Sequence, residues 1–592
     1  MRSTNTPGCV DRARLLRRSL LAILSASWVA AMAPAAAQDA GAGWQPENPE
    51  QALQPQDTPS LDTTAVVPPV RERAAAATAT VDVRAFRISG VGEHPQQGIT
   101  PGSMQALLDA RFAELAAGAD RVALGFDQLQ DVAQAVTRAY RDAGFVVATA
   151  YLPVQRIEEG VVAFEVLEGL LGEVIVEGNS RVRSSTIAGP ARALQGHALH
   201  RDEVDAALMA MRDIPGVTPS AVLQPGKAQG ETDLLVTVTE EERPFSVSLG
   251  ASNHGTELTG RYRAGIELAW RNALGLGDRV SVGYVHGLDP EQSTAASFGW
   301  NVPVPAVDGL AVVAAYTRSE MEVSSGPFAA LEMTGPTEVA QLGLDWKFHN
   351  RPLLQMQGSL RFVREHSKLE ALGFQLSDQS FDVVDAGFVL RHVDQRTRGV
   401  NLVQANLRHA INDRSLDPDL VTPLRTSDWT LLRVALARMQ YLTPTQRLYG
   451  RVYGQYTRDV LVPMEQIALG GPDSVRSLPV SEVLGDLGYQ ASLEYQVDAP
   501  GFGEVASPFG GRPWRDVLRF EVFVDHGRVR AAKGALAAEP GRTYNGAGAG
   551  LVFRLPHFHG LELELAGAKA IGNSASSDGD DFQAWARLGM TF

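Results

Sequence analysis

The sequence predicts small α+β modules followed by an all-β transmembrane barrel of about 16 antiparallel strands. Three observations predict this fold. Residues 242–592 alternate apolar and polar side chains over many short runs, residues 81–241 carry helix and strand signals in turn, and residues 1–37 have the order of a secretion signal. Successive side chains of a strand point to opposite faces, so strands with one apolar and one polar face can separate lipid from water.

The run Phe582–Phe592 shows the alternation most clearly. One face carries only apolar residues, which are Phe582, Ala584, Ala586, Leu588, Met590 and Phe592. The other face carries Gln583, Trp585, Arg587, Gly589 and Thr591. We interpret this run as the last membrane strand, and we expect Phe592 to be a signal that the barrel assembly machinery reads.

Similar alternation recurs at Tyr262–Trp270, Arg447–Tyr456 and Leu561–Leu565, with turns between the runs. The residues from 242 onward, at roughly 10 per strand plus loops, suit an even-numbered barrel of about 16 strands. A soluble β-sandwich or a solenoid is the alternative. Sandwiches do not usually repeat polar-inside, apolar-outside strands over this length, so the barrel is favoured.

Residues 1–37 predict a signal peptide. Arginines between Arg12 and Arg18 precede the apolar stretch Leu20–Met32, and the small residues Ala35–Ala37 follow it. A membrane anchor is the alternative, but this stretch is too short to span a bilayer. After residue 37 no run of 18 apolar residues occurs, which leaves a closed barrel as the membrane-spanning option. We therefore expect the outer membrane of a Gram-negative bacterium.

The composition and the remaining motifs argue against several functions. A net charge of -15 disfavours binding to nucleic acid. The single cysteine, Cys9, lies in the predicted signal, which excludes disulfides, thiolate metal sites and a cysteine nucleophile from the rest of the chain. His557 and His559 have no evident third metal ligand, and Gly546–Gly550 is not followed by the lysine of a phosphate loop. We predict no enzyme activity, no metal and no cofactor.

The region before the barrel divides into three parts. Residues 38–80 are rich in Pro, Gln, Ala and Thr and predict a flexible arm, with a possible short helix around Pro49–Leu53 that could act as a plug. Residues 81–168 predict a β-α-α-β-β module, with helices near Met104–Leu115 and at Asp127–Ala143. Residues 169–241 repeat this plan in shorter form.

The strands of these modules follow from short apolar runs. The first module has predicted strands at Val81–Ile88, Phe145–Leu152 and Val161–Val166. The second has strands at Gly172–Gly178, Val217–Leu223 and Asp233–Thr239 around a helix. That helix spans Arg201–Arg212, because Val204, Leu208 and Met211 recur at helical spacing.

These modules resemble a known family at several places. Tyr140–Gln155 and Val166–Gly169 resemble the first POTRA domain of two-partner secretion transporters, the hemolysin secretion/activation proteins of the ShlB/FhaC/HecB type. Leu223–Gly226, Gly230–Val238 and Asn253–Gly255 fit the second POTRA domain and the first barrel strand. The resemblance covers roughly residues 80–592 and implies POTRA 1 at 81–168, POTRA 2 at 169–241 and the barrel at 242–592.

Two further motifs match the barrel of this superfamily. The loop-tip motif, with Gly470, Gly471, Ser474, Val475 and Arg476, resembles the loop that folds back into the lumen. The strand motif, with Phe523, Asp525 and Gly527, resembles the strand that receives it. The resemblance implies a pair between Arg476 and Asp525; alternation agrees, since Asp525 falls on the lumen face, although it could instead pair with an arginine of a neighbouring strand. The family usually has Gly and an aromatic residue where this chain has Ser477 and Leu478.

The resemblance implies an outer-membrane pore. It would recognise an unfolded partner exoprotein of the TpsA type, large and β-helical, in the periplasm and move it to the cell surface without ATP. We expect the client to contact the first module near Phe145, Val147 and Tyr151. An assembly factor of the BamA or TamA type is the alternative function, and a plain porin is a third. The sequence does not identify the client.

Overall fold

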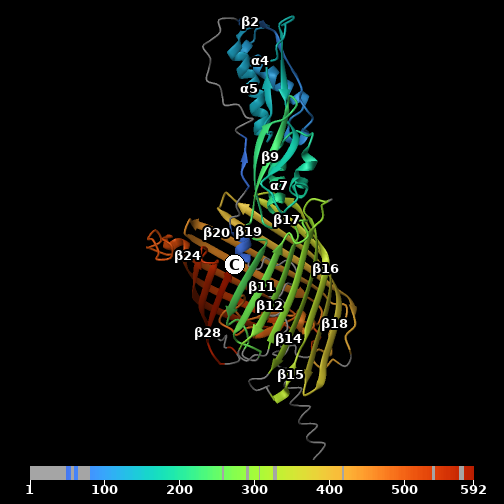
Figure 1. The fold of residues 1–592 in the computed structure, drawn as a ribbon, viewed down its shortest axis with the longest axis vertical. Coiled ribbons are helices and arrows are strands. Elements are labelled where there is room, and N and C mark those ends of the chain that lie inside the picture. The colour runs from blue at the N-terminus through green and yellow to red at the C-terminus, as the bar shows by residue number, and fades with distance from the viewer. Residues whose placement is uncertain are drawn as a thin grey trace, which may run out of the picture.

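The computed structural model describes residues 49–54, 59–63, 80–256, 259–288, 293–305, 307–323, 330–416, 419–535, 541–572, 576 and 579–592. The predicted signal peptide lies outside these residues, as does most of the predicted arm. The described chain forms an elongated pair of modules standing on one end of a β-barrel (Figure 1). Among the described helices, none is long and apolar enough to cross a membrane.

The barrel is closed and has 16 long antiparallel strands, as the sequence predicts. They are β10 (Phe245–Ser252), β11 (Arg263–Arg271), β12 (Arg279–Gly287), β13 (Ser293–Pro303), β14 (Leu310–Val323), β16 (Thr337–Asn350), β17 (Leu354–Ala371), β18 (Phe374–Asp394), β19 (Gly399–Asp413), β20 (Thr430–Thr443), β21 (Gln446–Thr457), β24 (Leu487–Asp498), β25 (Leu518–Arg530), β26 (Arg542–Leu555), β27 (Leu561–Ala570) and β28 (Phe582–Thr591). The short strand β15 (Met333–Thr334) extends the wall beside β14 and β17.

The first and last strands close the barrel. β10 pairs with β28 from Ser248 opposite Thr591 to Ser252 opposite Arg587. At the module end, Phe592 and Val247 exchange two backbone hydrogen bonds. At the far end, where β10 stops, the Asn253 side chain donates to the Ala584 carbonyl and accepts from the Ala586 amide, both at 2.8 Å. The seam is therefore short, and a side chain extends its hydrogen-bond ladder.

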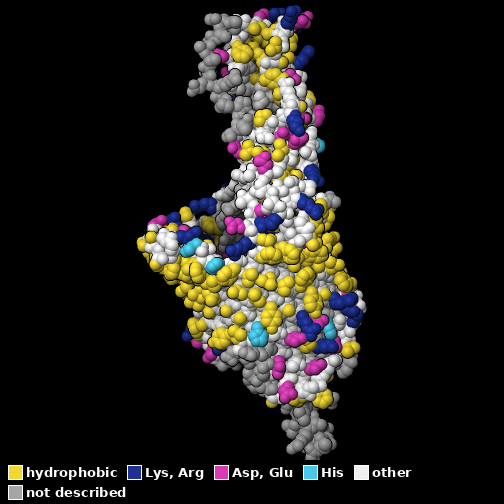
Figure 2. All heavy atoms as spheres, in the orientation of Figure 1, with side chains coloured by type: hydrophobic (Ala, Val, Ile, Leu, Met, Phe, Trp, Pro, Cys, Tyr) yellow, Lys and Arg dark blue, Asp and Glu magenta, His cyan; other side chains and the backbone are white. Residues whose placement is uncertain are grey.

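The outer wall carries an apolar belt. Figure 2 shows hydrophobic side chains across the visible face of the barrel, with charged side chains on the modules, at the rim beside them and toward the far end. Outward-facing Ile266, Val282, Leu342 and Leu360 belong to this belt and are each more than two-fifths exposed. Such a surface is stable only against lipid, because exposed apolar area of this extent is unfavourable in water.

The first module packs two helices on short strands. Its elements are β2 (Thr80–Val83), β3 (Ala85–Ser89), η1 (Pro95–Gln97), α4 (Pro101–Ala116), β4 (Val122–Gly125), α5 (Phe126–Asp142), β5 (Thr149–Tyr151) and β6 (Val161–Leu167). The predicted strand Val81–Ile88 is in fact two strands, since β2 pairs with β4 and β3 pairs with β6. The apolar side of α5 lies in the core, and the Tyr140 hydroxyl donates to Glu168 at 2.8 Å.

The second module repeats the design around its own core. Its elements are β7 (Leu170–Glu177), α6 (Ser184–Ala188), η2 (Gly189–Leu194), α7 (Arg201–Arg212), β8 (Val217–Pro225) and β9 (Glu231–Glu240). Helix α7 has the predicted bounds, and it buries Val204, Leu208 and Met211. Sequence periodicity missed α6 and η2, which are too short to show a repeat.

Charged contacts hold the second module on the barrel. Asp213, just after α7, accepts from Lys347 at 2.6 Å and from Asn350 at 2.8 Å. Asp202 in the first turn of α7 pairs with Arg351 at 2.6 Å. The module therefore rests on the turn between β16 and β17.

The predicted arm contains two ordered pieces. Helix α3 (Pro49–Leu53) contacts β19 and β20, and β1 (Leu61–Asp62) adds in parallel to β8 of the second module. The short helix that the sequence allows at Pro49–Leu53 is therefore present, and the described residues 59–63 are held on β8. Composition predicts local chain behaviour, and here the order comes from partners far away in the sequence.

Candidate functional site in the barrel lumen

A long loop between β21 and β24 folds into the barrel. Residues 458–486 form this lumen loop, which contains η4 (Pro463–Glu465), β22 (Ile467–Leu469) and β23 (Val483–Gly485). β22 and β23 pair to make a small hairpin, and both contact β25 of the wall. The loop tip between them, residues 470–482, contains the predicted loop-tip motif.

The structure brings Arg476 and Asp525 together. Arg476 donates through Nε to Asp525 Oδ2 at 2.9 Å and through Nη2 to Asp525 Oδ1 at 2.6 Å, so the guanidinium grips both carboxylate oxygens. The Arg476 backbone amide also donates to Asp525 Oδ2 at 3.1 Å. Both side chains are almost fully buried, which strengthens these charge-assisted bonds.

Other wall residues complete the shell around this guanidinium. Arg476 Nη1 donates to Glu494 at 2.7 Å, and Nη2 donates to Ser492 Oγ at 2.7 Å. The ring of Phe523 lies 3.3 Å from the Arg476 Cζ, as in a cation–π contact. Trp585 of β28 donates from Nε1 to the Arg476 carbonyl at 2.8 Å, so the loop tip also touches the strand that closes the barrel.

Glycines in the wall make room for the tip. A Cβ on Gly527 would lie 2.9 Å from Val475, and a Cβ on Gly546 would lie 2.4 Å from the Ser477 hydroxyl oxygen. At Gly470 and Gly471 the φ angles are +111° and +101°, values that side-chain-bearing residues rarely adopt. Gly527 of β25 and Gly546 of β26 therefore make room for the loop tip at the wall.

The loop tip accommodates Ser477 and Leu478, which stand where the family usually has Gly and an aromatic residue. Both residues are fully buried. Leu478 packs in an apolar cluster with loop and wall residues, which are Ile467, Leu469, Val475, Val483, Val529 and Tyr544. Within the loop tip, Ser474 Oγ accepts from the Gly470 amide at 3.2 Å. An aliphatic side chain thus takes the place of the aromatic ring that the family resemblance implies.

A second cluster of ion pairs holds the base of the lumen loop on the wall. This cluster was not predicted from the sequence. The carboxylate of Glu465, at the end of η4, accepts from Arg408 of β19 at 2.7 Å and from Arg433 of β20 at 2.9 Å. Arg408 also pairs with Glu365 and with Asp385. The sequence signal for the wall residues of this cluster is their position on the lumen face of alternating strands, and Glu465 in the loop has no such signal.

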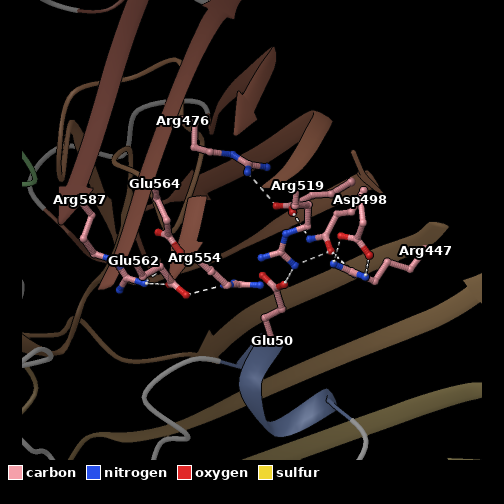
Figure 3. Close-up of polar contacts among 11 residues, drawn as sticks. Glu50, Arg447, Arg476, Asp498, Arg519, Arg554, Glu562, Glu564 and Arg587 are labelled. Atoms are coloured by element: carbon pink, nitrogen blue, oxygen red, sulfur yellow. Dashed lines mark hydrogen bonds and ion pairs between the residues drawn. The ribbon is translucent and has the colours of Figure 1, made fainter. Parts of the chain in front are cut away.

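Helix α3 is the second element inside the lumen (Figure 3). Glu50 pairs with Arg519 of β25, and Arg391 of β18 donates to the carbonyls of Ala52 at 2.8 Å and Gln54 at 2.9 Å. Leu53 is fully buried in a cluster with wall residues, which are Val400, Leu402, Ala437, Met439 and Tyr449. The contacts of the helix thus include one ion pair, two hydrogen bonds and one apolar anchor.

The predicted client-contacting residues need a correction. Phe145 is 2 % exposed and Val147 is 8 % exposed, and they lie in the cores of the first and second modules respectively. The segment lies where the modules meet, since Phe145 pairs across an isolated bridge with His200. A client could not reach these two side chains without separating the modules. Tyr151 is half-buried, and its hydroxyl donates to Glu165 at 2.7 Å.

Phe592 and the histidine motif lie at the module end of the barrel. The Phe592 ring stacks on His559 at 4.4 Å between centroids, and it remains 41 % exposed. His559 thus contacts an aromatic ring. Within the described residues, no group of three or more His, Cys, Asp or Glu side chains could hold a metal ion.

The chain matches two family descriptions. Residues 230–553 match "Haemolysin secretion/activation protein ShlB/FhaC/HecB", and residues 95–169 match "POTRA domain, ShlB-type". The heme/hemopexin transporter protein HuxB of Haemophilus influenzae is 23% identical over 494 residues, covering 79% of this chain and 82% of that protein. The hemolysin transporter protein ShlB of Serratia marcescens is 21% identical over 406 residues, covering 66% and 69%.

Solved structures share the fold. CdiB from Escherichia coli matches with a TM-score of 0.67 at 17% identity, over 100% of both chains. CdiB from Acinetobacter baumannii matches with a TM-score of 0.61 at 15% identity, over 92% of this chain and 95% of that one. These findings confirm the predicted fold class, the family and the outer-membrane location. The chain therefore belongs to the haemolysin secretion/activation protein family ShlB/FhaC/HecB, whose members are two-partner secretion transporters of the outer membrane with periplasmic POTRA domains.

Proposed function

We propose that this protein exports a secreted partner polypeptide through its barrel, with the lumen loop and α3 as movable obstacles. The observation that carries this proposal is how the two elements are held. Each is attached to the wall through a few ion pairs and hydrogen bonds, besides small apolar clusters. A hydrated client passing through the lumen could replace these polar contacts with water, which lowers the cost of moving each element aside.

The two fastenings of the lumen loop suggest an order of opening. The tip is held on β24 and β25 through Arg476, while the base is held on β19 and β20 through Glu465. Releasing the tip frees residues 470–482 from the β24–β25 side while the base stays attached. The loop would then swing about its base and would not have to leave the barrel.

We propose that the first module captures the unfolded client by strand addition. In the described part of the module, β5 pairs with no strand other than β6, and the Ala150 amide of β5 donates to the Thr137 hydroxyl of α5 at 2.9 Å, a bond that a client strand would replace. An extended peptide could pair there, with main-chain hydrogen bonds supplying the affinity. Among the predicted contact residues, Tyr151 on β5 is the one that such a client could touch.

Membership of the family supports a proposal for the client and for the force that drives export. We propose a large exoprotein of the TpsA type, β-helical in its folded form, whose folding outside the cell prevents return and so drives export without ATP. The names of the relatives HuxB and ShlB associate them with heme/hemopexin and with hemolysin. We also propose that the barrel assembly machinery recognises Phe592.

Comparison of secreted and outer-membrane proteomes after deletion of the gene tests this function. Loss of one large exoprotein, with other barrels unchanged, is the expected result. Loss of many outer-membrane barrels would instead identify an assembly factor of the BamA or TamA type. Normal export of every large exoprotein, together with reduced uptake of small solutes, would identify a porin.

A further inference from the structure

One sector of the outer barrel wall, formed by β20, β21, β24, β25 and β26, combines a hollow with arginines that pair with none of the described carboxylates. The hollow has a volume of about 780 Å³. Its outward side chains include Leu436, Val452, Leu493 and Val524, which are 43–52 % exposed and therefore face the lipid. The hollow opens on the membrane side of the wall.

Strand register shows how the hollow is built. Two neighbouring rows of outward residues cross the strands side by side. One row is Leu436, Val452, Ala491, His526 and Asn545. The other is Arg438, Gly450, Leu493, Val524 and Ala547. The small residues Gly450 and Ala491 sit between larger apolar neighbours, so the wall is indented there. We call this indentation the wall groove.

Three arginines lie beyond the groove toward the end far from the modules. Arg528 and Arg530 follow His526 at every second position of β25, so they share its outward face, one and two rows further out. Two residues along a strand span about 6.8 Å, so these guanidiniums begin where the groove ends. Arg458, after β21, is also exposed, and its Nε lies 3.4 Å from the Tyr456 hydroxyl.

These arginines lack carboxylate partners among the described residues. No Asp or Glu of the described chain lies within 4.0 Å of the charged atoms of Arg458, Arg528 or Arg530. The other side of the barrel differs. There, outward-facing Arg318 pairs with Glu320 and Glu338, and Arg364 pairs with Asp382. One sector of the far rim thus keeps three positive charges that no described carboxylate neutralises.

Polar rings join the groove to the arginines. His526 bridges Tyr489 at 3.1 Å and Asn545 at 2.7 Å on the outer surface. Tyr489 lies directly opposite Arg528 across the β24–β25 ladder. Tyrosine and histidine are typical of the depth where acyl chains meet headgroups. The order along the wall is therefore apolar groove, polar rings and cations.

We propose that this sector binds a phosphorylated lipid of the outer leaflet, with acyl chain in the wall groove and phosphate on Arg458, Arg528 and Arg530. Arginine is suited to this role, because its planar fork binds phosphate oxygens in pairs and accepts partial burial. The wall groove, one to two rows of outward residues away from Arg528 and Arg530, supplies the apolar contact for the acyl chain. Charge complementarity selects a phosphate-bearing lipid over a neutral one.

The test uses the full chain purified in detergent and native mass spectrometry with defined lipids. Lipid A with both phosphates is compared with the same lipid after dephosphorylation. We expect wild type to bind the phosphorylated form at least tenfold more tightly. Equal binding of the two forms by wild type would overturn the proposal, and this comparison requires no variant to fold.

Variants then assign the site. The triple change Arg458→Gln, Arg528→Gln, Arg530→Gln should reduce the preference for phosphate to less than threefold. The matched control, Arg318→Gln with Arg364→Gln, changes paired outward arginines and should keep the preference. Ala491→Phe fills the groove and should weaken binding of both lipid forms while leaving the charges in place.

Two results would contradict this assignment. Unchanged phosphate preference in the triple variant would place the lipid elsewhere. A wild type that runs as a dimer, together with a triple variant that runs as a monomer and binds lipid unaltered, would show that the sector contacts a second copy of the chain.

Discussion

Replacing Arg476 with alanine should release the tip of the lumen loop while leaving the barrel closed. In the native protein this side chain donates to both oxygens of Asp525, to Glu494 and to Ser492. The variant removes all four bonds and leaves two carboxylates in a buried site without their cation. None of the strand-to-strand hydrogen bonds of the wall depends on this side chain.

The size of the effect follows from burial. Both Arg476 and Asp525 have side chains that are at most 6% exposed. Removing one partner of a buried pair typically costs about 3–5 kcal/mol, because the remaining charge is left uncompensated. Since 1.4 kcal/mol is a factor of ten, the ratio of seated to released loop should fall by roughly 100-fold to 4000-fold. Arg476→Lys should give a smaller loss, because an ammonium keeps the charge but cannot make the fork.

Thiol labelling measures this ratio. Val475 is fully buried beside Gly527, and the single native cysteine is Cys9, so Val475→Cys in a Cys9→Ser background gives one reporter. We expect maleimide to label this reporter slowly when Arg476 is present. With Arg476→Ala the labelling rate should rise by at least tenfold. Export of the partner protein should fall in the same cells, because the proposed movement about the loop base requires a tip that returns to one position on the wall.

Arg447→Ala is the matched control. Arg447 makes an equivalent fork to Asp498 at 2.9 and 3.0 Å, but this pair joins β21 to β24 and does not hold the loop tip (Figure 3). Its loss should leave the reporter protected. If Arg476→Ala also leaves the reporter protected and export normal, the idea that this arginine seats the loop is wrong.

Three further outcomes follow from the lumen contacts. Arg519→Ala removes the ion pair to Glu50 and should raise the conductance of the purified barrel in planar bilayers, whereas unchanged conductance would mean that α3 is held by its other contacts. Gly546→Ala should unseat the loop, because its Cβ would meet the Ser477 hydroxyl. Adding Ser477→Gly should restore the protection of the thiol reporter. A double variant whose reporter is labelled as fast as that of the single variant would contradict this packing. Trp585→Phe removes one buried hydrogen bond of the loop tip and should weaken seating of the loop by about 1–3 kcal/mol. The same thiol labelling measures this change. The mobility of the unheated, folded barrel in gels should stay the same.

Local patterns in the sequence determined the wall and the orientation of its side chains. The alternation in β25 and β28 assigned Asp525 and Trp585 to the lumen side, because the period of two is a property of each strand alone. The same holds for α7, whose bounds followed from its helical spacing. The family resemblance then supplied the loop motif that meets Asp525.

Only the tertiary structure decided which distant segments meet. The contacts of Glu465 at the loop base, the contacts that hold α3 against the barrel wall, and the burial of Phe145 and Val147 left no local signal, since each depends on residues from another element. Packing can reverse a local expectation. The apolar run near Phe145 suggested a surface for a client, but Phe145 lies in the core of the first module and Val147 in the core of the second. Periodicity reports which face of an element is apolar, whereas the partner that covers this face is set by the path of the whole chain.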